Sequence, residues 1–149
     1  MTNTDSLPSL IDIPALRRAA FRPVLLLFTG FLVVSAAMIA VLVAMSVGGA
    51  SIESAIWIRC SLVLASAVVL LLIGASAARG SRAAWIRLRI ITPIVVIAVI
   101  VIVSIPGFLP DWVRVEQAVC GLLVLPAVIL VNLPRMGRLF PKAVATATA

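Results

Sequence analysis

Four long apolar runs, separated by short polar stretches, dominate the pattern of the chain: Val24–Val47, Ile58–Ala78, Ile90–Leu109 and Val115–Leu133. As an α-helix, each run is long enough to cross a hydrocarbon core about 30 Å thick. The pattern therefore predicts an all-α polytopic membrane protein with a four-transmembrane-helix bundle. We expect one transmembrane domain at 23–134, flanked by an N-terminal tail at 1–22 and a C-terminal tail at 135–149.

Composition excludes an ordinary water-soluble domain, because 64% of the residues are hydrophobic, 11% are charged and the mean hydropathy is +1.30. The chain is also basic, with a net charge of +7. A nucleic-acid surface would interleave basic residues with exposed polar and aromatic ones, whereas here the basic residues flank the apolar runs. We therefore expect membrane lipids as partners, together with a second copy or other membrane proteins, and no nucleic acid.

The basic residues also predict an orientation. All but Arg59 and Arg114 lie on one side of the predicted bundle, before the first run, between the second and third, and after the fourth: Arg17, Arg18, Arg22, Arg79, Arg82, Arg87, Arg89, Arg135, Arg138 and Lys142. Positive residues near short loops are retained in the cytoplasm. We therefore expect both termini and the middle loop in the cytoplasm.

The N-terminal segment leaves two interpretations open. Pro8 and Pro14 limit any helix to a short piece that starts near Pro14. Such a piece would lie at the membrane interface and lead into Arg17 and Arg18. The other interpretation is a partly disordered tail.

All three tryptophans are followed by Ile or Val and then Arg, and all lie at predicted membrane boundaries: Trp57, Trp85 and Trp112. An indole prefers the headgroup level, and an adjacent arginine can reach the phosphates. We therefore expect these residues to be interface anchors. A second interpretation is an internal duplication that makes two parallel helical hairpins, since the runs after Trp57 and Trp112 both end in an Arg-x-x-Arg segment.

Arg59 and Glu116 are the charged residues closest to the membrane interior, and both lie near the outer ends of their predicted helices. With Trp57 and Trp112 as depth markers, they differ in height by roughly 3 Å at 1.5 Å per residue. They could pair between helices or extend separately to the interface. A functional alternative is an outward-facing polar layer of Arg59, Glu116 and Gln117 that binds an anionic headgroup.

The remaining chemistry is sparse. The chain has no histidine and two cysteines, so we expect no metal site, no cofactor and no catalytic residues. The depth markers place Cys60 and Cys120 roughly 7.5 Å apart in height, which argues against a disulfide. We expect both to be buried thiols. Cys120 lies four residues after Glu116, so these two residues should share an inward-facing side of the helix.

Small residues form a row along the first predicted helix: Ala36, Ala40, Ala44 and Gly48. Association between helices in a membrane depends on close van der Waals contact, and a row of small side chains lets a partner backbone approach. We expect the first helix to use this row as a packing surface. The partner could be another helix of the same chain or a second protein.

The stretch from Arg79 to Leu133 carries, in order, the segments Arg-Gly-Ser-Arg, Arg-Leu-Arg-Ile-Ile, Ile-Pro-Gly-Phe, Glu-Gln-Ala-Val-Cys-Gly-Leu-Leu and Val-Asn-Leu. In these motifs it resembles uncharacterised small four-helix integral membrane proteins of actinobacteria. The resemblance implies a four-span fold and a multi-pass location in the plasma membrane, the inner membrane of a bacterium. It implies no activity and no site residues.

These patterns favour a non-enzymatic membrane protein that acts through helix contacts, such as an accessory or scaffold subunit. The small-residue row, the anchored ends and the lack of charge in the middle of the spans all point in this direction. The alternative is a small oligomeric transporter or lipid-handling protein that uses the Arg59 and Glu116 layer.

Overall fold

The structure, a computed structural model, describes residues 12–105 and 110–140 of the chain. Over these residues it is all-helical, with five helices: α1 (Ile13–Val47), α2 (Ser54–Ala78), α3 (Arg82–Ser104), α4 (Asp111–Asn132) and α5 (Pro134–Arg138). The first four are long and apolar enough to cross a membrane, so the predicted all-α fold with four long apolar helices is confirmed. The predicted end of the third span, at 106–109, lies outside the described residues.

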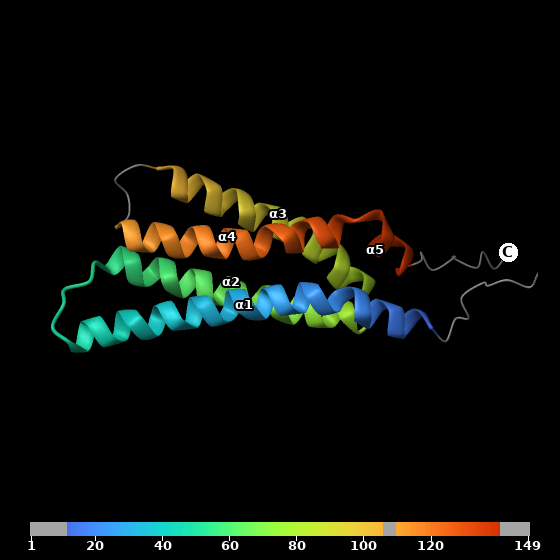
Figure 1. The fold of residues 1–149 in the computed structure, drawn as a ribbon, viewed down its shortest axis with the longest axis horizontal. Coiled ribbons are helices and arrows are strands. Elements are labelled where there is room, and N and C mark those ends of the chain that lie inside the picture. Colours follow the sequence, from blue (N-terminus) through green and yellow to red (C-terminus); the bar gives the residue numbers. More distant parts are fainter. Residues whose placement is uncertain (1–11, 106–109, 141–149) are drawn as a thin grey trace, which may run out of the picture.

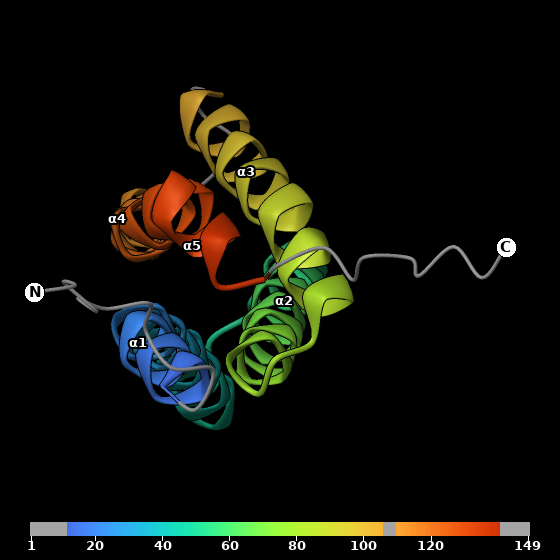
Figure 2. The same ribbon diagram turned by 90° about the vertical axis from the view of Figure 1, so that its right-hand side faces the viewer.

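The four long helices run up and down and surround a common core (Figures 1 and 2). α1 packs against α2 and α4, and α3 packs against the same two helices, so α2 and α4 lie on one diagonal of the bundle. α3 starts beside α2 and ends beside α4, leaning away from α2 along its length (Figures 1 and 2).

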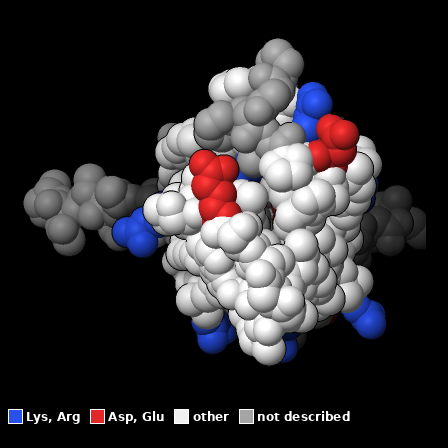
Figure 3. Space-filling model, turned by 90° about the vertical axis from the view of Figure 1, so that its left-hand side faces the viewer, with Lys and Arg blue, Asp and Glu red and all other residues white. Residues whose placement is uncertain are grey.

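The two ends of the bundle differ in charge. We call the end with the α2–α3 turn, the start of α1 and α5 the arginine-rich end. The opposite end, with the links from α1 to α2 and from α3 to α4, is called the acidic end because Glu53 and Asp111 are exposed there. Figure 3 looks at the acidic end and shows acidic side chains standing out from a mostly uncharged surface.

α1 extends further toward the N-terminus than its apolar run. It begins at Ile13, with Pro14 in the first turn, where a proline costs no hydrogen bond, and it continues through Pro23. Phe21 and Val24 on either side of Pro23 are fully buried in the core, which holds the helix together across the proline. The described part of the predicted tail, from residue 13 to 22, is therefore helical and continuous with the first span, and residues 1–11 lie outside the described part.

Aromatic side chains of α1 fill much of the core. Phe21, Phe28 and Phe31 are all buried and pack in one cluster with Leu70 of α2. The Phe28 ring lies against Gly74 of α2, where an added Cβ would be 3.2 Å from the nearest ring carbon. The missing side chain at this position lets α1 and α2 approach closely.

The turn between α2 and α3 is tight because a glycine reverses the chain. Gly80 has a φ of +113°, an angle that residues with a Cβ rarely adopt. The Ser81 amide donates to the Ser76 carbonyl at 3.2 Å and the Gly80 amide donates to the Ala77 carbonyl at 2.9 Å, the hydrogen-bond pattern of a Schellman motif. The Ser81 hydroxyl then accepts a hydrogen bond from the Ala84 amide at 3.2 Å and caps α3.

Candidate functional site

The three polar residues that the sequence predicts as a layer come together in the half of the bundle near the acidic end. Glu116 and Gln117 lie on α4 and are buried, with exposed fractions of 9% and 1%. Arg59 lies on α2 and is half-buried. It lines the same cavity as Gln117 and interacts electrostatically with Glu116. The layer therefore joins the diagonal helices α2 and α4.

Glu116 accepts hydrogen bonds from its own helix. Gln117 Nε2 donates to Glu116 Oε2 at 2.8 Å, and Cys120 Sγ donates to Glu116 Oε1 at 3.2 Å. The Ser35 hydroxyl of α1 also interacts with the Cys120 thiol and donates to the Phe31 carbonyl at 2.9 Å. The expected inward-facing side of the fourth helix is confirmed, since Cys120 is 1% exposed.

Arg59 has no such partners. Its three guanidinium nitrogens, Nε, Nη1 and Nη2, are buried and make no hydrogen bond within the described chain. Arg59 forms no ion pair with any described residue either. Within residues 12–105 and 110–140, the ion pair with a nitrogen–oxygen distance of 4.0 Å or less joins Arg114 to Asp111, at 3.9 Å, on α4. The direct pairing of Arg59 with Glu116 that depth alone allowed is thus not formed, and Glu116 accepts its hydrogen bonds from donors on α4 instead.

A cavity of about 230 Å³ lies beside the Arg59 side chain, between α2 and α3. Its polar lining residues are Arg59, Ser66 and Gln117, and the other lining residues are apolar. A second cavity of about 210 Å³ continues along the same two helices and shares Leu62, Ser66 and Val95 with the first. The two cavities form one groove with a cationic group at one end and apolar walls along the rest.

The two cysteines are free and buried, as the sequence predicts, with exposed fractions of 3% for Cys60 and 1% for Cys120. The thiols of Cys60 and Cys120 are near enough to influence one another. Within the described ranges, no group of three or more His, Cys, Asp or Glu side chains is arranged to hold a metal ion. The polar groups around Cys120 therefore provide hydrogen bonds and a single carboxylate, that of Glu116.

The small-residue row of α1 is exposed at every position: Ala36, Ala40, Ala44 and Gly48. The buried face of this part of the helix carries Ser35, Met38 and Leu42 instead. At 100° per residue, Leu42 lies about 160° from Ala44, so the row is on the side opposite the core. Of the two partners left open by the sequence, a helix of the same chain is excluded among the described residues.

The tryptophans do not share one environment. Trp57 is half-buried at the start of α2, and Trp112 is 39% exposed at the start of α4, as expected of residues at an interface. Trp85 is only 7% exposed and belongs to the core cluster, so its prediction as an interface anchor with a half-solvated ring is wrong. Its indole turns inward because it stacks on the Phe140 ring.

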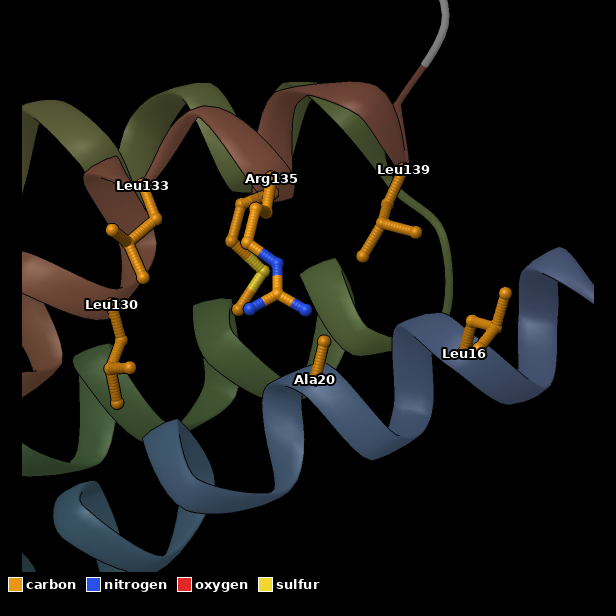
Figure 4. A pocket seen from close by; sticks show the side chains of 7 residues that line it. Leu16, Ala20, Leu130, Leu133, Arg135 and Leu139 are labelled. Carbon is orange, nitrogen blue, oxygen red and sulfur yellow. The ribbon is translucent and has the colours of Figure 1, made fainter.

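A further cavity of about 390 Å³ lies at the arginine-rich end between α1, α4 and α5, and Figure 4 shows its lining: Leu16, Ala20, Leu130, Leu133, Arg135, Met136 and Leu139. Arg135 reaches from α5 toward Ala20 of α1 and is the charged member of this lining. The sequence interpretation used Arg135 as an orientation signal and placed 135–149 in a tail. In the structure this segment begins inside α5, which runs from Pro134 to Arg138, and both Met136 and Phe140 are buried.

Comparison with protein-family models, curated proteins and solved structures found no match for this chain. The resemblance to small actinobacterial membrane proteins therefore stays a prediction. The features of the molecule that bear on function are the exposed row on α1 and the polar layer of α2 and α4.

Proposed function

We propose that the protein is a non-enzymatic integral membrane protein that serves as an accessory or scaffold subunit through helix–helix contacts. The observation that carries this proposal is the exposed row on α1. Its four positions, Ala36, Ala40, Ala44 and Gly48, lie on the side of the helix that packs against nothing within the described chain.

The row is significant for helix packing if the protein lies in a membrane. Four apolar helices support such a setting, and in lipid an exposed leucine or valine costs nothing, so large apolar side chains can cover a lipid-facing surface. Small side chains instead let a partner helix come close enough for extensive van der Waals contact. In this part of α1 the core face is formed by Ser35, Met38 and Leu42, and the row lies on the other side, so the partner belongs to a second chain.

The proposed location is the plasma membrane of a bacterium, with the arginine-rich end in the cytoplasm. The distribution of basic residues supports this orientation, since Arg59 and Arg114 are the exceptions to the grouping at the arginine-rich end. Both termini would then lie in the cytoplasm, and the row would lie in the outer half of the membrane.

Site-specific photocrosslinking in intact membranes tests the proposal. A photoreactive residue at Ala40 or Ala44 should give a defined adduct, whose second component mass analysis would identify as another copy or another membrane protein. The same residue at Ile94 of α3, which is 58% exposed, is the matched control and should crosslink to lipid alone. Adducts of equal yield from all three positions, or from none, would reject the row as an interface.

A further inference from the structure

The Arg59 guanidinium lacks hydrogen-bond partners for all of its donor nitrogens. Among the described residues the other buried polar side-chain atoms without a partner are single nitrogens, Nε of Arg17 and Nε1 of Trp85. A buried charge is costly unless it is paired and hydrogen-bonded. Three unsatisfied nitrogens on one charged group therefore call for a partner from outside the chain.

The acidic groups near this layer do not supply that partner. Both Glu116 oxygens accept hydrogen bonds from α4, and Asp111 is fully exposed and paired with Arg114. Glu53, at the N-cap of α2, is exposed and no ion pair joins it to Arg59 within the described chain. The positive charge of Arg59 is therefore not neutralised by direct contact with a carboxylate.

The groove beside Arg59 indicates the shape of the missing partner. Its head is formed by Arg59 and Gln117, and the groove continues along α2 past Ser66, which lines both cavities, as far as Val69. Arg59 and Val69 are ten residues apart, or about 15 Å along the helix at 1.5 Å per residue. A ligand that fits both parts has a compact anionic group joined to a long apolar chain.

We propose that this groove binds an anionic phospholipid, with the phosphate on Arg59 and one acyl chain between α2 and α3. A guanidinium presents a planar fork of donors that matches phosphate oxygens in two-point contact. A net negative headgroup suits a guanidinium whose donor nitrogens are all unused, and it would add to the electrostatic interaction that Arg59 already has with Glu116. The groove lies between α2 and α3, the pair of helices that diverge toward the acidic end (Figure 1). This inference does not depend on the helix contacts of α1.

Lipid-dependent thermal stabilisation of the purified full-length protein in neutral detergent tests the charge part. Phosphatidylglycerol should raise the melting temperature more than phosphatidylcholine with the same acyl chains, because it supplies phosphate with net negative charge. In Arg59→Gln the apparent affinity for phosphatidylglycerol should fall by about tenfold. Arg114→Gln is the matched control, since Arg114 lies at the same end but already has partners, the Asp111 carboxylate at 3.9 Å and the Val103 carbonyl at 3.3 Å, and it should keep the wild-type affinity.

The melting temperature of Arg59→Gln without lipid shows whether the substitution itself affects stability. Replacing an unpartnered buried charge with a neutral group should leave the lipid-free melting temperature unchanged or higher. Equal phosphatidylglycerol affinity in wild type and Arg59→Gln would overturn the proposal. A lower lipid-free melting temperature for Arg59→Gln would also overturn it, since Arg59 would then be satisfied within the protein.

A second pair of variants tests the acyl-chain part. Ala98→Phe fills the groove without a change in charge and should lower the affinity for phosphatidylglycerol by at least about tenfold. Ile97→Phe, one residue earlier and 60% exposed on the outer side of α3, should have no such effect. Inorganic phosphate is the control for the headgroup without an acyl chain. If it stabilises the protein as strongly as the lipid does, or if Ala98→Phe binds lipid normally, the groove does not hold an acyl chain and the proposal fails.

Discussion

The Trp85 indole stacks on the Phe140 ring, with centroids 5.2 Å apart and planes 10° from parallel. Phe21 of α1 meets the same Phe140 ring edge-on at 5.9 Å, and the Arg17 guanidinium lies over it at 5.6 Å. Arg89 lies over the Trp85 ring at 5.7 Å. This aromatic cluster joins the start of α1, the start of α3 and the segment after α5, and so closes the arginine-rich end of the bundle.

Replacing Trp85 with alanine should destabilise the protein by about 3–5 kcal/mol, since it removes a large buried side chain and its stack on Phe140. Trp112→Ala is the matched control. Because Trp112 is 39% exposed, its loss should cost about 1 kcal/mol or less. Equilibrium unfolding in mixed micelles, followed by circular dichroism, measures both.

Trp85→Phe separates stacking from the indole nitrogen. It keeps an aromatic ring against Phe140 and removes a buried Nε1 that has no partner in the described chain, so it should cost much less than Trp85→Ala. Equal destabilisation by Trp85→Ala and Trp112→Ala would contradict a core role for Trp85 and restore its prediction as an anchor.

Gly80→Ala should be more destabilising than Gly49→Ala, although both glycines have positive φ, +113° and +86°. Backbone strain alone costs about 1–3 kcal/mol for a residue with a Cβ at either position. At Gly80 the added Cβ would also lie 2.9 Å from an Arg17 guanidinium nitrogen, so this flexible side chain would have to shift from its place over the Phe140 ring, whereas at Gly49 the Cβ would meet nothing within 4 Å. Melting temperatures of the two variants give the comparison.

A double-mutant cycle with Arg17→Ala tests the cause of that difference. In the Arg17→Ala background, Gly80→Ala should cost about as much as Gly49→Ala, because the crowded guanidinium is gone. An unchanged penalty for Gly80→Ala in this background would show that Arg17 plays no part, and that the extra cost comes from the turn itself.

The apolar runs were sufficient to predict the fold, because a segment of that length and composition is stable as a membrane-spanning helix irrespective of its neighbours. The apolar runs could not predict that the Trp85 side chain is buried in the core. Its environment depends on Phe140, far along the chain, and on a short helix, α5, that starts at a proline in the predicted tail. Contacts of this kind follow from tertiary packing, and local patterns do not encode them.

The candidate site was also predicted in part. Depth along the helices predicts Arg59 near the level of Glu116, since rise per residue is fixed, and the two groups do interact electrostatically. Depth does not reveal rotation about each helix axis, so it could not show that Gln117 and Cys120 would donate to the Glu116 oxygens while the Arg59 nitrogens stayed without a partner. For the same reason, the sequence could not show which side of α1 faces the core, and the partner of the α1 row stayed undecided.

Single cysteines at Ser51 and Ala83 should report the proposed orientation. Both positions are exposed, Ser51 near the acidic end and Ala83 at the arginine-rich end. In a Cys60→Ala, Cys120→Ser background, a membrane-impermeant thiol reagent should label only position 51 in intact cells. The serine at position 120 keeps a donor for Glu116.

Ala83 is preferable to its neighbour Ser81, whose hydroxyl caps α3 and whose loss would weaken the helix by about 1 kcal/mol. Labelling of both positions after the cells are opened is the control for accessibility. Labelling of position 83 rather than 51 in intact cells would reverse the orientation and place the α1 row in the cytoplasmic half.

Enlarging Ala40 and Ala44 to leucine should separate the two possible roles of the α1 row. Both residues are exposed in the described chain, so the double variant should keep the melting temperature of the isolated protein. Association with a second chain should weaken by about 1–3 kcal/mol per substitution, because larger side chains overpack a close helix contact. Val41→Leu, 100° around the helix from Ala40 and 47% exposed, should affect neither property.

Crosslinked yield in membranes measures association, and thermal unfolding in detergent measures stability, so the two effects are read independently. A lower melting temperature for the leucine variants would mean that the row packs inside its own chain. Unchanged association in all three variants would mean that the row reflects only the alanine-rich composition of α1. Selective loss of association in the Ala40 and Ala44 variants is the outcome that a scaffold or accessory subunit requires, because in lipid only close packing distinguishes a partner helix from an acyl chain.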